Sequence, residues 1–224
     1  MNRALSLIAV IALGTGASAC VQDGQRPPRR VGGACDTCEL MYEGMPKELG
    51  WQTAIAREGE PGEPLEMRGV IYRNDGKTPA PDVILYVYHT DAKGYYSPVP
   101  GQTQARRHGH LRGWMKTDRE GRYQFRTIRP ASYPNGRAPA HIHAIVKEPQ
   151  LNEYYIDEYE FADDPLVTRK ERELMEGRGG MGIVDLTRKK KACGSAGAIS
   201  SLAETSRTTN KIGRDRCSGR RSAD

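Results

Sequence analysis

Short segments in which polar and apolar residues alternate recur along the chain, separated by turn residues. Arg122–Ile128 (RYQFRTI) alternates with period two, and Asp82–His89 (DVILYVYH) is rich in β-branched and aromatic residues. Turn sequences such as Asn74-Asp75-Gly76 separate these segments, and only Leu166–Glu176 has helical character. The pattern predicts an all-β sandwich with long loops and little helix. The expected strands are Met67–Tyr72, Asp82–His89, Gly113–Thr117, Arg122–Ile128, Ala140–Val146 and Tyr155–Phe161.

The positive charge of the chain is concentrated near its C-terminal end. The 224 residues carry a formal net charge of +6, but residues 188–224 alone hold 10 Lys/Arg and 3 Asp/Glu, which leaves the preceding residues at a net −1. A folded basic face would have to come from those preceding residues, so no nucleic-acid partner is expected. The length fits one domain with extensions, and we expect residues 39–187 to form that domain.

The N-terminus has the pattern of an export signal. Arg3 precedes a short apolar run, and Ala17-Ser18-Ala19 forms a small-residue cleavage site, so residues 1–19 are predicted to be a signal peptide. Cys20 follows directly and is expected to be lipidated, which would give a lipoprotein facing the periplasm or the exterior; a soluble secreted protein is the alternative. Residues 20–38 would then be a tether, and membrane contact is expected only through the lipid on Cys20.

Two cysteines lie close together at the end of the predicted tether. Cys35 and Cys38, in the sequence CDTC, are expected to form a local disulfide in an oxidising compartment. A thioredoxin-like redox role would need a βαβ pattern around the pair, and a zinc site would need a second pair of ligands; the sequence supplies neither.

His141-Ile142-His143 lies within an expected strand. Alternate residues of a strand point to the same face, so the two imidazoles would lie side by side as a pair of metal ligands. His108-Gly109-His110 has the same spacing, but the Gly and Arg residues around it favour ordinary loop histidines. Tyr96 and Tyr133 lie in loops, and each taken alone would be interpreted as a packing residue.

Three stretches carry a resemblance to a known family: RGVIYRNDGKTPAPDVILYVYHTDAKGYYS, RGWMKTDREGRYQFRTIRPASYP and PAHIH. In this order and spacing, over about Met67–Asp164, they resemble the intradiol ring-cleavage dioxygenases, and especially their exported single-domain relatives. The resemblance implies an Fe(III)-dependent, non-haem enzyme that inserts O2 into a catechol-type aromatic diol and releases a muconate-type diacid. The partners it implies are a small aromatic diol and O2.

In that family two tyrosines and two histidines hold the ferric ion. By position these correspond to Tyr96, Tyr133, His141 and His143, with Tyr95 as the neighbouring alternative to Tyr96. The resemblance also makes Tyr133 the ligand that leaves the metal and takes up a substrate proton. Phenolate oxygens are hard anionic ligands that suit Fe(III), and iron also accepts imidazole, so the residue types agree with the implied metal.

Two positions depart from the family pattern. An arginine usually stands three residues before the first histidine, where this chain has Ala138; Arg137, one place further away, is the candidate to stabilise charge that develops on the substrate ring. A glutamine is usual in the strand after the histidine pair, and the matching residue is Glu158. The second change replaces a neutral amide by a carboxyl group.

Two other interpretations compete with the enzyme. A non-catalytic, prealbumin-like β-sandwich binding module would account for Gly69–Tyr123, but it would have no use for four metal ligands. A copper or zinc site would use the two histidines alone, and with zinc it would be colourless, unlike a red-brown ferric tyrosinate protein.

Residues 188–224 are predicted to be a basic tail that is either disordered or frameshifted. Exported intradiol relatives tend to end with a segment like RDIxLGxNIPxY. Permitted codons for Ala198–Lys211, read in the frame that starts at the third base of Gly197, can spell RDIVLGRNIPDYQ and a stop. Lys189-Lys190-Lys191 can be encoded by an adenine run, where a frame slip is easy. In that case Cys193 and Cys217 are accidental and form no disulfide.

Overall fold

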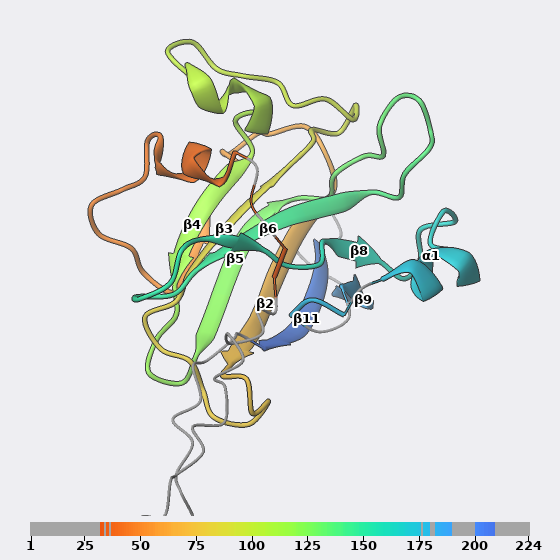
Figure 1. Ribbon diagram of the computed structural model, residues 1–224. Coiled ribbons are helices and arrows are strands. Elements are labelled where there is room, and N and C mark those ends of the chain that lie inside the picture. The colour runs from red at the N-terminus through yellow and green to blue at the C-terminus, as the bar shows by residue number, and fades with distance from the viewer. Residues whose placement is uncertain are drawn as a thin grey trace, which may run out of the picture.

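The computed structural model describes residues 32–33, 35, 37–175, 177–179, 182–189 and 200–208. The strands of this part of the chain form two sheets that pack face to face (Figure 1). One sheet has the order β1-β5-β2-β11-β10, and the other has the order β4-β3-β6-β8-β9, with β7 paired to β6. The strands are β1 (Gln52–Ala54), β2 (Pro64–Tyr72), β3 (Ile84–His89), β4 (Arg112–Lys116), β5 (Arg122–Ile128), β6 (His141–Lys147), β7 (Tyr154–Tyr155), β8 (Tyr159–Phe161), β9 (Ile183–Val184), β10 (Leu186–Lys189) and β11 (Ser200–Thr208).

The core lies between the two sheets and is built from alternate residues of their strands. On β6, Ile142, Ala144 and Val146 are buried in this core. Met67 of β2 and Phe125 of β5 enter the same core from the other sheet, and both are fully buried. Alternation along a strand therefore places the remaining β6 side chains on the outer face of their sheet. The predicted all-β sandwich is confirmed.

The elements differ from the sequence-based prediction in detail. The expected strand Tyr155–Phe161 is two short strands, β7 and β8, and the expected helix shortens to α1 (Arg169–Leu174). Thr168 caps this helix by accepting a hydrogen bond from the Glu171 backbone N–H, and Met175 is already extended. Two short 3₁₀ helices, Cys38–Tyr42 and Gln104–His108, complete the described secondary structure.

The segment that contains Cys38–Tyr42 covers part of the outer face of the sheet formed by β4, β3 and β6. Cys35 and Cys38 form the expected disulfide, with their Cα atoms 5.3 Å apart, within the usual range. Cys38 and Met41 are buried against aromatic residues of β3. The Trp114 indole N–H donates a hydrogen bond to the Met41 carbonyl at 2.7 Å. The CDTC segment therefore packs on the domain instead of belonging to a free tether.

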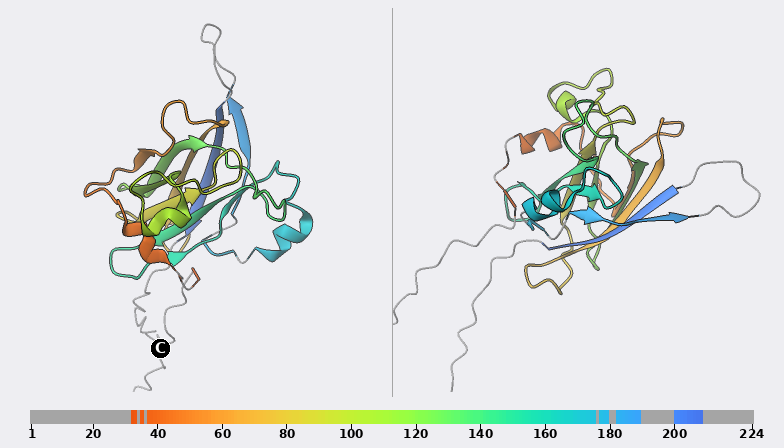
Figure 2. Two further views of the ribbon diagram at one scale, coloured as in Figure 1. Left: turned by 90° about the horizontal axis from the view of Figure 1, so that it is seen from above. Right: turned by 90° about the vertical axis from the view of Figure 1, so that its right-hand side faces the viewer.

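Part of the predicted C-terminal tail is a strand. β11 pairs with β2 in parallel and with β10 antiparallel, so Ser200–Thr208 lie inside the sheet (Figure 2). The expectation of disorder is wrong for these nine residues. The predicted signal peptide 1–19, the lipidation site Cys20 and both tail cysteines lie outside the described residues. No helix in the described part is both long enough and apolar enough to cross a membrane.

Candidate metal centre

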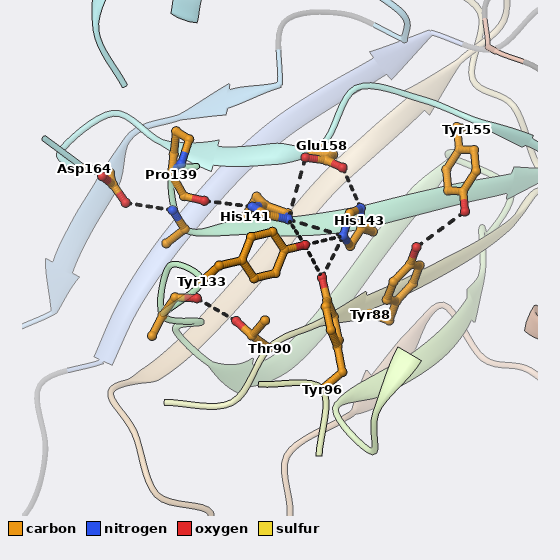
Figure 3. A network of polar contacts seen from close by, with 12 residues as sticks. Tyr88, Thr90, Tyr96, Tyr133, Pro139, His141, His143, Tyr155, Glu158 and Asp164 are labelled. Carbon is orange, nitrogen blue, oxygen red and sulfur yellow. Dashed lines mark hydrogen bonds and ion pairs between the residues drawn. The ribbon is translucent and has the colours of Figure 1, made fainter. Parts of the chain in front are cut away.

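The histidine pair occupies the outer face of the six-stranded sheet. His141 and His143 both lie on β6, and the pairing of His143 with Tyr88 of β3 places an aromatic ring directly beside the second histidine. The two rings stack with their centroids 4.5 Å apart. His141 is only 6% exposed, because the loops that follow β3, β5 and β7 cover this part of the sheet (Figure 3).

A tight turn after β3 presents Tyr96 to the histidines. The Asp91 carboxylate accepts hydrogen bonds from the backbone N–H groups of Lys93 and Tyr95 and from the Ser97 hydroxyl, at 2.8, 3.1 and 2.6 Å. The Tyr95 carbonyl accepts the Asp91 N–H at 2.8 Å, which closes the turn. This network fixes the direction of Tyr96. The alternative ligand Tyr95 is 55% exposed, and the structure places Tyr96 in the cluster.

The loop that carries Tyr133 lies directly against this turn. The Thr90 hydroxyl donates to the Ala131 carbonyl at 2.7 Å, and the Ala131 N–H donates to the Asp91 carbonyl at 3.2 Å. Gly94 has φ +85°, and a Cβ placed there would lie 2.2 Å from the Ser132 carbonyl oxygen. Only glycine lets the two backbones approach so closely, and this approach brings Tyr133 to Tyr96.

The four predicted metal ligands converge through their polar atoms. The Tyr96 hydroxyl oxygen lies 2.8 Å from that of Tyr133 and 2.7 Å from His143 Nε2. The Tyr133 hydroxyl oxygen lies 3.0 Å from His141 Nε2 and 3.5 Å from His143 Nε2, and the two Nε2 atoms are 3.2 Å apart. These distances make one hydrogen-bonded cluster, in which two phenol oxygens and two imidazole nitrogens, all atom types that bind iron, face one another.

Both histidines are held through the nitrogen that points away from the cluster. His141 Nδ1 donates to the Pro139 carbonyl at 2.7 Å, and His143 Nδ1 pairs with Glu158 Oε1 at 2.5 Å. An acceptor at Nδ1 keeps the proton there and leaves Nε2 free to bind a metal. Among the described residues, His141, His143 and Glu158 form the one group of His, Cys, Asp or Glu side chains that could hold an ion.

Burial sets the protonation of the cluster. It raises the pKa of the Tyr96 and Tyr133 hydroxyls, so both phenols are neutral near pH 7 unless a cation is nearby. It lowers the pKa of His141, which favours the neutral, ligating imidazole. Burial alone would raise the pKa of Glu158, but the hydrogen bond and charge of His143 outweigh it and leave that pKa lowered.

The other residues singled out in the sequence lie outside the cluster. Arg137 is exposed on the turn after Tyr133, and its backbone N–H donates to the Asn135 side chain at 3.1 Å. The second histidine pair, His108 and His110, also lies outside this cluster. His108 is buried against Tyr86 and Tyr88, and His110 bonds to the Ser97 carbonyl.

Two features of the site were not predicted. Tyr88 is stacked between His143 and His108, with centroids 4.5 and 3.8 Å away, so it supports the face of a predicted ligand ring. The second feature is the contact of Glu158, at a position that departs from the family pattern, with His143. The sequence DVILYVYH does indicate Tyr88. Residues that alternate with the core-facing ones point to the outer face of the strand, which is where the histidine pair lies.

Comparison with known proteins places this chain in a family. A family model described as Dioxygenase matches residues 51–176, which is more than half of the chain. Catechol 1,2-dioxygenase 2 of Acinetobacter lwoffii is 33% identical over 106 residues, which cover 40% of this chain and 37% of that protein. The protocatechuate 3,4-dioxygenase beta chain of Burkholderia cepacia is 31% identical over 119 residues, half of each chain. The match therefore spans about two fifths to one half of these curated relatives.

Solved structures share the fold. Wild-type catechol 1,2-dioxygenase of Acinetobacter radioresistens superposes with a TM-score of 0.56 at 15% identity, covering 80% of this chain and 63% of that one. The dioxygenase domain of a carbohydrate-binding fusion from Streptomyces sp. SirexAA-E gives 0.53 at 17% identity, covering 75% and 93%. Together with the family model and the curated relatives, the sandwich shows that this chain belongs to the intradiol dioxygenase family.

Proposed function

We propose that this chain is a non-haem Fe(III) dioxygenase that cleaves a catechol-type aromatic diol between its two hydroxyl-bearing carbons and yields a muconate-type diacid. The observation that carries the proposal is the convergence of two phenol oxygens and two imidazole nitrogens, from Tyr96, Tyr133, His141 and His143, on one point. Membership in the intradiol dioxygenase family supports it, because iron is the metal of that family.

The donor set suits a trivalent ion. Two phenols can each lose a proton and supply a negative charge, which a cation in the cluster would favour by lowering their raised pKa values. The two neutral imidazoles complete a four-residue set. When bound, Fe(III) would supply a Lewis-acidic template for the diol oxygens and make the ring reactive towards O2.

Tyr133 is the residue proposed to move and to accept a substrate proton. Tyr96 is fixed by the Asp91 network, and both histidines lie on the central strand β6. Tyr133 instead lies on an irregular Pro- and Gly-containing loop, so it can leave the cluster with the smallest disturbance. Its phenolate oxygen is then a general base for the diol proton.

Arg137 and Cys20 have proposed roles outside the cluster. Arg137 lies on the turn between Tyr133 and the histidine strand, where its cationic side chain can approach charge that develops on a bound ring. Lipidation at Cys20 is proposed to hold the exported domain on a membrane, and the Cys35–Cys38 disulfide agrees with an oxidising compartment. The expected result of Cys20→Ser is release of active protein into the soluble fraction.

The ligand set is tested by comparing two histidine variants of the iron-loaded protein. His143→Ala should lose iron and its visible absorption together. His110→Ala is the matched control, because His110 bonds to Ser97 and Glu60 outside the cluster, and it should keep both. A His143→Ala protein with full iron and an unchanged spectrum would show that the ligand assignment is wrong.

The reaction is tested by adding a panel of catechols to the iron protein without oxygen. A shift of the visible band reports binding of the diol to the metal, even where turnover is slow. Admission of O2 should then give a diacid product. A protein that binds zinc but no iron, or that never responds to a diol, contradicts the proposed function.

A further inference from the structure

Glu158 is placed opposite His143 by the strand pairing of β6 and β8. Tyr159 pairs with Ile142 and Glu160 pairs with His141, so Glu158 continues this register to the position opposite His143. Side chains opposite each other in an antiparallel pair lie on the same face of the sheet. The carboxylate therefore stands beside the His143 ring on the outer face, as Figure 3 shows.

The two oxygens of this carboxylate have different neighbours. Oε1 lies 2.5 Å from His143 Nδ1, whereas Oε2 lies 3.9 Å from His141 Nε2, beyond hydrogen-bond reach. His143 Nδ1 is on the side of the ring away from Tyr96, and Nε2 of the same ring is the atom that enters the cluster. Glu158 therefore acts on the cluster through the His143 ring.

The two histidines are held by unequal partners. His141 donates to a neutral backbone carbonyl, that of Pro139, and His143 is paired with an anionic carboxylate. A carboxylate at Nδ1 makes an imidazole a stronger donor at Nε2 and adds a negative charge near any metal there. With the Tyr96 and Tyr133 phenolates, the protein itself would then supply three negative charges.

We propose that Glu158 is a positioning residue that fixes His143 as an Nε2 ligand and tunes the centre for a trivalent over a divalent cation. The proposal rests on the metal-binding role proposed for His143. Because the Glu158 side chain is 40% exposed, water screens part of its charge. We therefore expect an effect near the lower end of the ~10- to 100-fold range typical of residues that support a metal ligand.

Two variants separate orientation from charge. Glu158→Gln keeps an oxygen that can accept the Nδ1 proton but removes the charge, and Glu158→Ala removes both. Glu153→Gln is the matched control, because it also removes an acidic side chain, one whose hydrogen bond is with the Tyr42 hydroxyl and not with a histidine of the cluster. Ga(III), a redox-inert trivalent ion, and Zn(II) serve as probes in chelator competition on the full chain.

Glu158→Gln should weaken Ga(III) binding about tenfold and Zn(II) binding clearly less, while Glu153→Gln changes neither by more than about twofold. Glu158→Ala should weaken both metals, and reduction of the iron-loaded Glu158→Gln protein should become easier. Equal losses for the two metals in Glu158→Gln, or no loss for either, overturn the proposed charge effect.

Nitrogen NMR of the metal-free protein tests the positioning by itself. We expect the His143 proton on Nδ1 in the wild type and in Glu158→Gln, and a mixture of tautomers in Glu158→Ala. A metal-free wild type with Nδ1 unprotonated overturns the positioning role, whatever metal binds. If Nδ1 carries the proton but the protein takes up no iron, the proposed function fails while the pairing of Glu158 with His143 stands.

Discussion

Gly94 is the residue where the two tyrosine loops touch, and replacing it by alanine tests whether that contact builds the site. Its φ of +85° is unfavourable for any residue with a Cβ, at a cost of about 1–2 kcal/mol. The new Cβ would also lie 2.2 Å from the Ser132 carbonyl oxygen, where real contacts essentially never fall below 3.0 Å. The loop before Tyr133 must therefore retreat by about 1 Å, and such overpacking costs about 1–3 kcal/mol more.

Gly136→Ala is the matched control for this change. Gly136 has φ +62° in the same Tyr133 loop, but a Cβ there meets nothing within 4 Å, so only the backbone cost of about 1–2 kcal/mol applies. Denaturant unfolding should show Gly94→Ala to be less stable than Gly136→Ala by about 1–3 kcal/mol. Because a displacement of about 1 Å can lower turnover ~100-fold, Gly94→Ala should also lose iron and activity that Gly136→Ala retains. Equal stability and equal iron content in the two variants would refute the reasoning.

Three further predictions concern single side chains. Tyr133→Phe should keep part of the iron but slow ring cleavage about 100-fold or more, because a ligand and a proton acceptor are both lost; wild-type turnover contradicts the role. Arg137→Ala should lower kcat/KM about tenfold with little effect on iron content, and an unchanged kcat/KM would remove Arg137 from the reaction. Burial lowers the pKa of His89 to about 4, so the folded protein favours the neutral imidazole. The resulting contribution to the free energy of unfolding is complete above about pH 6.5. It is lost as the pH falls towards 4, by about 3 kcal/mol in total. Urea unfolding of the wild type and His89→Gln between pH 4 and 7 measures this difference, and parallel pH profiles contradict it.

Local pattern was enough to predict the sandwich and the histidine pair. Alternation in AHIHAIV places both imidazoles on one face whatever strand lies next to them, and β6 has that arrangement. Tyr96 and Tyr133 came from the family resemblance, since no periodicity links two loop residues 37 positions apart. Their contact depends on the Asp91 network and on the close approach at Gly94, which join the two loops in space.

Contacts that depend on strand register were beyond the sequence. The pairing of Glu158 with His143 follows from the alignment of β8 against β6, and a shift by one residue would turn the carboxylate to the other face. The stack of Tyr88 between His143 and His108 similarly requires β3 to lie beside β6 and the 3₁₀ helix Gln104–His108 to fold over it. Such neighbours are set by tertiary packing, which single-sequence patterns do not encode.

The strand β11 shows a conflict between its place in the sheet and its composition. It lies between β2 and β10, a position with neighbours on both sides. Strands in such positions are normally rich in β-branched and aromatic residues. Ser200–Thr208 reads SSLAETSRT, in which only Leu202 and Ala203 are apolar. The composition of this segment is therefore unusual for a strand with neighbours on both sides.

We propose that a shifted reading frame would remove that conflict. The codons for Ala198–Lys211, read one frame away, can spell RDIVLGRNIPDYQ, which places Ile, Val and Leu in succession near the start of β11. Burial of even one of these side chains contributes about 1.5–3 kcal/mol, so a chain that carries the shifted segment should be more stable to denaturant by about 2 kcal/mol or more. The gene sequence is the first test: codons that do not spell this segment contradict the frameshift. If they do spell it, the protein with the restored segment should unfold at higher denaturant concentration than the present chain, and an equal midpoint would mean that β11 gains nothing from the apolar residues.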